Sequence, residues 1–211
     1  MQNLLEQSQV EEILHRLDAA YPEAGCALHY DNRFQLLCAV MLSAQTTDIS
    51  VNKVTPSLFQ CYPDAASMAK ADPAHLEEII RSIGLYRNKS RNLIRMSAEL
   101  DRKYGGLVPG SYEKLVALPG VGRKTANVVL AEGFGVQRIA VDTHVYRVAN
   151  RIGLANSDNV LETEKELMNC IPETAWTRSH HLLIFHGRNC CTARRPKCEE
   201  CPIAMLCRKR I

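Results

Sequence analysis

The sequence predicts an all-α protein, and two patterns carry that prediction. Apolar residues recur at three- and four-residue spacing almost throughout the 211 residues, whereas the strict alternation that indicates strands is almost absent. Glycine and proline interrupt the pattern at short intervals, so helices with short connections are expected. Since 46% of the residues are hydrophobic, the chain can bury a sizeable core without disulfides.

The expected helices are separated by recognisable turn residues. Gly105 and Gly106 come before Pro109, and Gly135 and Gly153 each follow a helical pattern. The predicted helices lie near Ser8 to Ala20, Arg33 to Leu42, Asp48 to Gln60, Pro73 to Arg81, Arg87 to Tyr104, Tyr112 to Ala117, Arg123 to Phe134, Thr143 to Arg151, Asn159 to Cys170 and Ala175 to Phe185.

Composition and charge point to an intracellular protein with a basic tail. No stretch approaches the roughly 20 apolar residues that span a bilayer, and the polar start lacks a basic leader and an apolar run. We therefore expect a cytoplasmic protein without a membrane partner. The net charge is only +3, but seven Lys or Arg oppose two Glu between His186 and Ile211. Either a solvated tail or a phosphate-binding surface explains this excess.

The cysteines fall into two groups. Of the nine, Cys26, Cys38, Cys61 and Cys170 are scattered singly, where free cysteine usually acts as a small buried hydrophobe. Structural disulfides do not persist in reducing compartments, so the crowded cysteines of the tail indicate metal binding.

Four tail cysteines are close enough in sequence to wrap one metal centre. They are Cys191, Cys198, Cys201 and Cys207, whereas Cys190 is taken as spare because adjacent residues rarely serve one centre together. Pro196 and Pro202 favour a loop there. Four thiolates suit tetrahedral zinc or an iron–sulfur cluster, and ligand chemistry alone does not choose between them.

A glycine turn opens the helix that begins at Arg123. Gly120 and Gly122 allow close approach of a DNA backbone, and unpaired N–H groups at the helix start can bind phosphate. Arg123 and Lys124 stand at the positive end of the helix dipole, where cations are disfavoured unless an anion or a catalytic need compensates. The dipole, Arg123 and burial are expected to lower the pKa of Lys124, as a Schiff-base nucleophile requires. The turn resembles the helix-hairpin-helix motif of DNA-repair proteins.

Eighteen residues after Lys124, Asp142 precedes the next predicted helix and is a credible N-cap. His144 follows, either in the helix cap or in a substrate pocket. Two loops also carry candidates. In the first loop, helix capping explains Asp48 but does not readily explain Gln45. In the second, Leu85 precedes the long helix that bears Arg87, Lys89, Arg91 and Arg95. A core leucine in a turn is an equal alternative for Leu85.

From about Glu11 to Cys207 the chain resembles the endonuclease III family. The features that carry the resemblance are the glycine turn, the spacing between Lys124 and Asp142 and the spacing of the tail cysteines. The resemblance implies a helix-hairpin-helix glycosylase fold with a six-helix barrel over residues 26–135. Residues 1–25 and 136–211 would form an iron–sulfur cluster domain, with a DNA cleft between the two. It also implies a 4Fe–4S cluster on Cys191, Cys198, Cys201 and Cys207.

The resemblance implies a role for each candidate. Lys124 and Asp142 would be the catalytic pair, Gln45 would fill the gap left by an extruded nucleotide, and Leu85 would be the wedge on the opposite strand. Gly120, Gly122 and Arg123 would bind DNA, and Asp48 and His144 would line the lesion pocket.

The expected activity is that of a bifunctional DNA glycosylase and AP lyase in base excision repair. It would act as a monomer on double-stranded DNA with damaged pyrimidines or abasic sites, on the nucleoid. Two alternatives are a mismatch adenine glycosylase, which lacks the lysine and adds a C-terminal domain, and a non-catalytic iron–sulfur protein that binds DNA.

Overall fold

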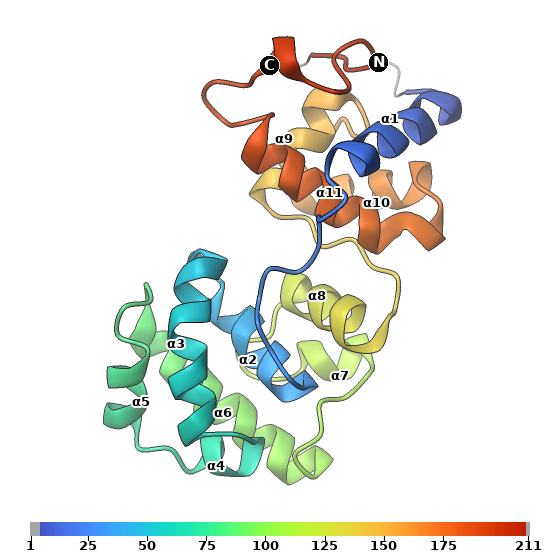
Figure 1. The fold of residues 1–211 in the computed structure, drawn as a ribbon. Coiled ribbons are helices and arrows are strands. Elements are labelled where there is room, and N and C mark those ends of the chain that lie inside the picture. The colour runs from blue at the N-terminus through green and yellow to red at the C-terminus, as the bar shows by residue number, and fades with distance from the viewer. Residues whose placement is uncertain (1–4, 210–211) are drawn as a thin grey trace. The chain divides into compact units, whose positions relative to one another are not determined.

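The structure is a computed structural model that describes residues 5–209. Residues 1–4 of the predicted cluster domain, and Arg210 and Ile211 of the basic tail, lie outside the described residues. Within that range the chain forms helices and no strand, so the all-α prediction is confirmed (Figure 1). In the described part of the chain, no helix is long and apolar enough to cross a membrane.

The described residues divide into two compact units. We call Ala27–Val136 the barrel unit, and the segments up to Cys26 and from Gln137 onward the cluster unit. The helices of the barrel unit are α2 (Arg33–Leu42), α3 (Asp48–Cys61), α4 (Ala65–Ala69), α5 (Pro73–Ile79), α6 (Tyr86–Tyr104), α7 (Tyr112–Val116) and α8 (Arg123–Phe134).

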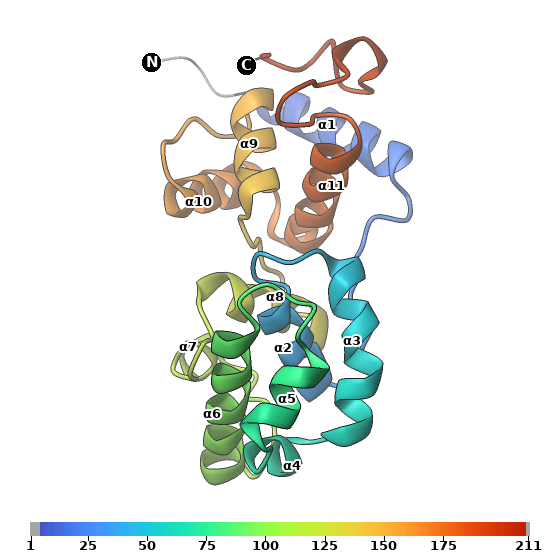
Figure 2. The same cartoon turned by 90° about the vertical axis from the view of Figure 1, so that its left-hand side faces the viewer.

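Helix α2 forms the centre of the barrel unit because its sequence, RFQLLCAVML, is apolar on every side. Every residue from Phe34 to Leu42 is buried. Helices α3, α6 and α8 pack against it, and both cartoon views show α2 between α3 and α8 (Figures 1 and 2). The buried Cys38 lies on this helix, in agreement with its expected role as a small hydrophobe.

Helix α4 is missing from the sequence prediction. Its five residues are too few to show a helical period, and Asp64 starts it by accepting a hydrogen bond from the backbone N–H of Ser67 at 2.8 Å. It packs against α6.

The cluster unit contains α1 (Gln7–Ala20), α9 (Thr143–Ile152), α10 (Val160–Cys170), the 3₁₀ turns η1 (Glu173–Ala175) and η2 (Cys198–Glu200), and α11 (Trp176–Asn189). Its core includes Leu17 from α1, Val148 from α9 and Leu183 from α11. Arg178 also donates to the backbone oxygens of Tyr21 and Ala24, so α1 is tied to α11 by polar as well as apolar contacts.

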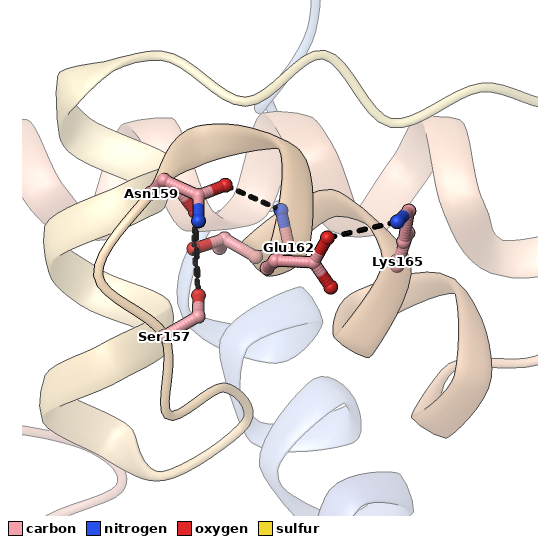
Figure 3. A network of polar contacts seen from close by, with 5 residues as sticks. Ser157, Asn159, Glu162 and Lys165 are labelled. Carbon is pink, nitrogen blue, oxygen red and sulfur yellow. Dashed lines mark hydrogen bonds and ion pairs between the residues drawn. The ribbon is translucent and has the colours of Figure 1, made fainter.

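A polar network starts α10 (Figure 3). Asn159 accepts a hydrogen bond from the backbone N–H of Glu162 at 2.9 Å, and Ser157 donates to the Asn159 carbonyl. Glu162 is paired with Lys165 at 2.8 Å. Asn159 therefore acts as the N-cap of α10, and the helix begins one residue later than its sequence suggests.

Candidate active site and metal centre

The turn between α7 and α8 depends on glycine at position 120 for an internal reason. Gly120 has φ +76°, and a Cβ there would lie 2.9 Å from the Cβ of Asn92 on α6. Any other residue would combine a left-handed backbone with a steric clash. The turn is thus pressed against α6.

Gly122 is different, because it faces open space. It is the N-cap of α8 at φ −95°, a conformation open to other residues, and a Cβ would meet nothing within 4 Å. It also offers no side chain to cap the first turn of α8. The protein itself gives no packing reason for glycine here, whereas a close ligand would.

Arg123 and Lys124 occupy the first turn of α8, and both are exposed. Arg123 donates to the hydroxyl of Tyr112 on α7 at 3.3 Å, with its guanidinium 5.7 Å from the centre of that ring. The exposure of Lys124 corrects one expectation, since the protein does not bury this side chain.

Asp142, in the cluster unit, is the N-cap of α9. Its Oδ1 accepts hydrogen bonds from the backbone N–H groups of His144 and Val145, both at 2.8 Å. Two fixed bonds and the positive end of the helix dipole hold the carboxylate in one orientation. The capping interpretation is therefore confirmed, and a cap of this kind is compatible with a catalytic role.

His144 is the second residue of α9 and is partly buried. Burial lowers the pKa of His144, and the charges of Arg147 and Arg188 lower it further, against the opposing effects of Asp142 and of a hydrogen bond to the Gly187 backbone. The Nδ1 of His144 lies 3.3 Å from Nη2 of Arg147.

Gln45 and Leu85 occupy two loops of the barrel unit. Gln45, between α2 and α3, and Leu85, before α6, are both exposed and have φ values of 54° and 60°. Left-handed backbone costs a residue other than glycine roughly 1–2 kcal/mol. The core interpretation of Leu85 is wrong, because the residue is 55% exposed. Thr47 caps α3 through the N–H of Ser50, and the partly buried Asp48 follows in the first turn.

Lys89 differs from the other basic residues at the start of α6. It is only 8% exposed, whereas Arg87, Arg91 and Arg95 are exposed. It stands four residues before the buried Leu93, so it lies on the buried face of the helix. The helical spacing of the apolar residues is the sequence signal that could have identified it.

The four predicted metal ligands line one cavity in the cluster unit. Cys191, Cys198, Cys201 and Cys207 all contribute to its wall, together with Cys190 and His186. The N–H of Lys209 donates to Sγ of Cys207 at 3.3 Å, and Arg151 approaches Sγ of Cys191 at 3.8 Å. Donors directed at sulfur stabilise thiolates, so the donor set fits an iron–sulfur cluster.

Cys190 and His186 lie deeper in the same wall. Sγ of Cys190 donates to the carbonyl of Lys197 at 3.5 Å, as a protonated thiol can. Atoms of His186, Cys190 and Cys201 approach one another within 4.8 Å, with Sγ of Cys201 3.7 Å from Nε2 of His186. His186 is buried, and its Nδ1 lies 3.1 Å from the hydroxyl of Tyr21.

Two arginines that the sequence analysis did not single out hold the start of the cysteine loop. Arg147 donates to the carbonyls of Gly187 and Cys191, and Arg151 donates to those of Thr192 and Ala193. They stand four residues apart on α9, so they lie on one face of that helix. This face of α9 is therefore a polar support for the metal centre.

Two family models match the chain. Residues 38–173 match the HhH-GPD superfamily of base excision DNA repair proteins, and residues 191–207 match the iron–sulfur binding domain of endonuclease III. Endonuclease III of Bacillus subtilis is 48% identical over 98% of this chain and 94% of its own length. Endonuclease III of Escherichia coli is 44% identical over 93% of each chain.

Solved structures agree with these matches. A trapped endonuclease III–DNA covalent intermediate superimposes with a TM-score of 0.93 and 49% identity, over 98% of this chain and 97% of that one. A thermostable thymine-DNA glycosylase, at 24% identity, has a TM-score of 0.84 over 96% of each chain, which is a likeness of fold.

Proposed function

Because the chain belongs to the endonuclease III family of base excision DNA repair proteins, we propose that it is a bifunctional DNA glycosylase and AP lyase. Its substrates are damaged pyrimidines and abasic sites in double-stranded DNA. The observation that carries this proposal is the position of Lys124. It is exposed in the first turn of α8, two residues after Gly122, and no side chain caps this end of the helix. An amine with no packing role stands where a phosphate backbone can approach.

DNA binds first through groups that are insensitive to sequence. The uncapped start of α8 offers backbone N–H groups to a phosphate, and Arg123 adds a positive charge beside them. The exposed Arg87, Arg91 and Arg95 of α6 extend this positive surface within the barrel unit.

The damaged nucleotide then leaves the stack, since a base inside a duplex cannot be reached. Leu85 separates bases as an apolar wedge, and Gln45 fills the gap with groups that can donate and accept hydrogen bonds. Asp48 and His144 contact the extruded base.

Lys124 is the nucleophile. Its neutral amine forms a bond from Nζ to C1′ of the sugar, the N-glycosidic bond breaks, and the base leaves with its electron pair and takes up a proton. Loss of the amine proton and opening of the sugar give an imine. The imine acidifies C2′, so removal of a C2′ proton expels the 3′ phosphate and cuts the strand.

Asp142 assists as a fixed carboxylate. Both cap bonds end on Oδ1, so we assign proton transfer and stabilisation of the developing positive charge to Oδ2. A carboxylate held by a helix cap is already oriented and needs no reorganisation during the reaction.

The iron–sulfur cluster is held by Cys191, Cys198, Cys201 and Cys207. The match to the iron–sulfur domain begins at Cys191 and ends at Cys207, which supports this set and leaves Cys190 outside it. When bound, the cluster links the two ends of the basic tail. We also propose that the protein acts as a monomer on the DNA of the nucleoid.

The test is a single-turnover assay on duplexes that each contain one damaged pyrimidine, with and without borohydride. Release of the base, a nick on the 3′ side and a covalent adduct in borohydride are expected together. Binding without base release would leave a DNA-binding iron–sulfur protein instead, and preference for adenine in a mismatch would indicate the sister glycosylase.

A further inference from the structure

Lys89 places a buried ammonium group against the loop that carries Gln45. Its Nζ donates to the backbone carbonyl of Leu42 at 2.9 Å and to Oγ1 of Thr46 at 2.7 Å. Burial lowers the pKa of Lys89, because a charge removed from water is unfavourable unless hydrogen bonds compensate. A charge in this place therefore needs a reason beyond filling space.

The two acceptors bracket the loop. Leu42 is the last residue of α2, so its carbonyl is one of the groups that a helix end leaves without an intrahelical partner, and a cation is favourable there. Thr46 directly follows Gln45 in the chain. One ammonium group thus fixes the start of the loop and the residue beside Gln45.

Lys89 is equally fixed to Leu85. Its backbone N–H donates to the Leu85 carbonyl at 3.0 Å, which makes Leu85 the N-cap of α6 and Lys89 a residue one turn later. Side chains of a helix point toward its N-terminus, so the Lys89 side chain reaches back past the Leu85 turn. The turn also lies against the Gln45 loop, because a Cβ on Gly84 would be 3.9 Å from the Gln45 carbonyl.

We propose that Lys89 is a positioning residue for base flipping, which holds the Gln45 loop and the Leu85 turn in the arrangement that enters the duplex. It touches neither DNA nor the reacting atoms. The inference rests on the proposed function, since it concerns the two residues assigned to the flipped state. It also explains how two strained residues keep their left-handed backbone, which persists only where the surroundings enforce it.

The experiment compares Lys89→Met with Lys103→Met on the full-length protein. Methionine keeps the length and apolar stem of lysine, and Lys103 is an exposed cation on the same helix, paired with Glu99. Single-turnover excision is measured on a fully paired duplex and on one whose lesion lies opposite an abasic analogue, where less stacking and pairing must be broken. Fluorescence of 2-aminopurine beside the lesion reports the opening itself.

Lys89→Met is expected to slow excision from the paired duplex roughly five- to 50-fold, because two buried acceptors lose their donor. Excision from the duplex with the abasic analogue should slow by less than about threefold, because flipping costs less free energy there. On the paired duplex, the rise in 2-aminopurine fluorescence should slow together with excision. Lys103→Met should resemble the wild type on both.

Thr46→Val provides a second route if Lys89→Met folds poorly. It removes the hydroxyl that accepts from Lys89 and that donates to the Ala44 carbonyl at 3.4 Å. Its effect should add only in part to that of Lys89→Met, because the two residues share one contact. Equal slowing on both duplexes, or fully additive effects, would overturn the role of Lys89 while leaving the glycosylase intact. A wild type that releases no base at all would overturn the proposed function as well.

Discussion

Gln45 and Leu85, which are far apart in the chain, share a left-handed backbone, and the Gln45 carbonyl lies close to Gly84, the residue before Leu85. Among the described residues, Lys209 is the only other residue besides glycine with positive φ. Backbone strain of this kind collects at functional sites, where a particular side-chain direction matters more than stability. The two residues proposed to enter the duplex are thus the two strained residues of the barrel unit.

Removal of either side chain should affect flipping more than chemistry. We expect Leu85→Ala and Gln45→Ala to slow excision from duplexes more than from single strands, because their role is to stabilise the flipped state. Leu107→Ala removes an apolar side chain that is 74% exposed and serves as the control. Parallel loss on both substrates would mean that Leu85 and Gln45 merely support the fold.

The strain at Leu85 should be visible in stability. At φ +60° glycine avoids the clash of a Cβ, so Leu85→Gly should be more stable than Leu85→Ala by about 1 kcal/mol. Both variants should excise equally slowly, since both lack the wedge. Urea unfolding gives the free energy of unfolding of the two variants. If Leu85→Ala were as stable as Leu85→Gly, the backbone at position 85 would not be strained.

The two glycines of the hairpin should separate folding from DNA binding. Gly120→Ala combines positive φ with a 2.9 Å contact to Asn92, so it should lower the free energy of unfolding by about 1–3 kcal/mol. Gly122→Ala meets open space and should lower stability by at most about 1 kcal/mol, the cost of alanine at an N-cap, yet weaken DNA binding by obstructing the phosphate. If Gly122→Ala bound DNA with wild-type affinity, the phosphate backbone would not lie against this turn.

The cluster should depend on Cys198 and not on Cys190. The protein is expected to be brown, with about four irons per chain, and Cys198→Ser should lose iron and DNA affinity together. Cys190→Ser keeps a donor for the Lys197 carbonyl and should retain its iron. Iron analysis and absorbance check both variants; stoichiometric zinc in a colourless protein, or equal iron loss, would show that the centre is assigned wrongly.

Lys124→Gln should keep the fold and much of the DNA affinity but lose nearly all excision and all borohydride trapping, because no Schiff base can form. Asp142→Asn is a matched change, since asparagine also caps a helix, and it should be severely slowed at unchanged stability. Asp142→Ala should additionally lose about 1 kcal/mol of stability with the cap. An adduct formed by Lys124→Gln at the wild-type rate would identify another amine as the nucleophile.

The helices were largely predictable because they depend on local signals. The expected bounds of the helices at Arg33–Leu42 and Arg123–Phe134 agree with the structure, since the apolar period and the flanking turn residues mark both ends. Helix α4 was not found because five residues carry no period. The end of α11 at Asn189 lies beyond the predicted Phe185, because Gly187 is buried inside the helix and does not end it.

By itself, the sequence determined the chemistry of this protein: a lysine after a glycine turn, an aspartate that caps the next helix, and four closely spaced thiols. These depend on residue type and local spacing. Tertiary structure alone decided that Gly120 is pressed against α6 while Gly122 is open, and that the ammonium of Lys89 donates to Leu42 and Thr46 while Lys124 is exposed. Burial and backbone strain arise from contacts between segments distant in sequence, and a residue's identity does not specify which segments those are.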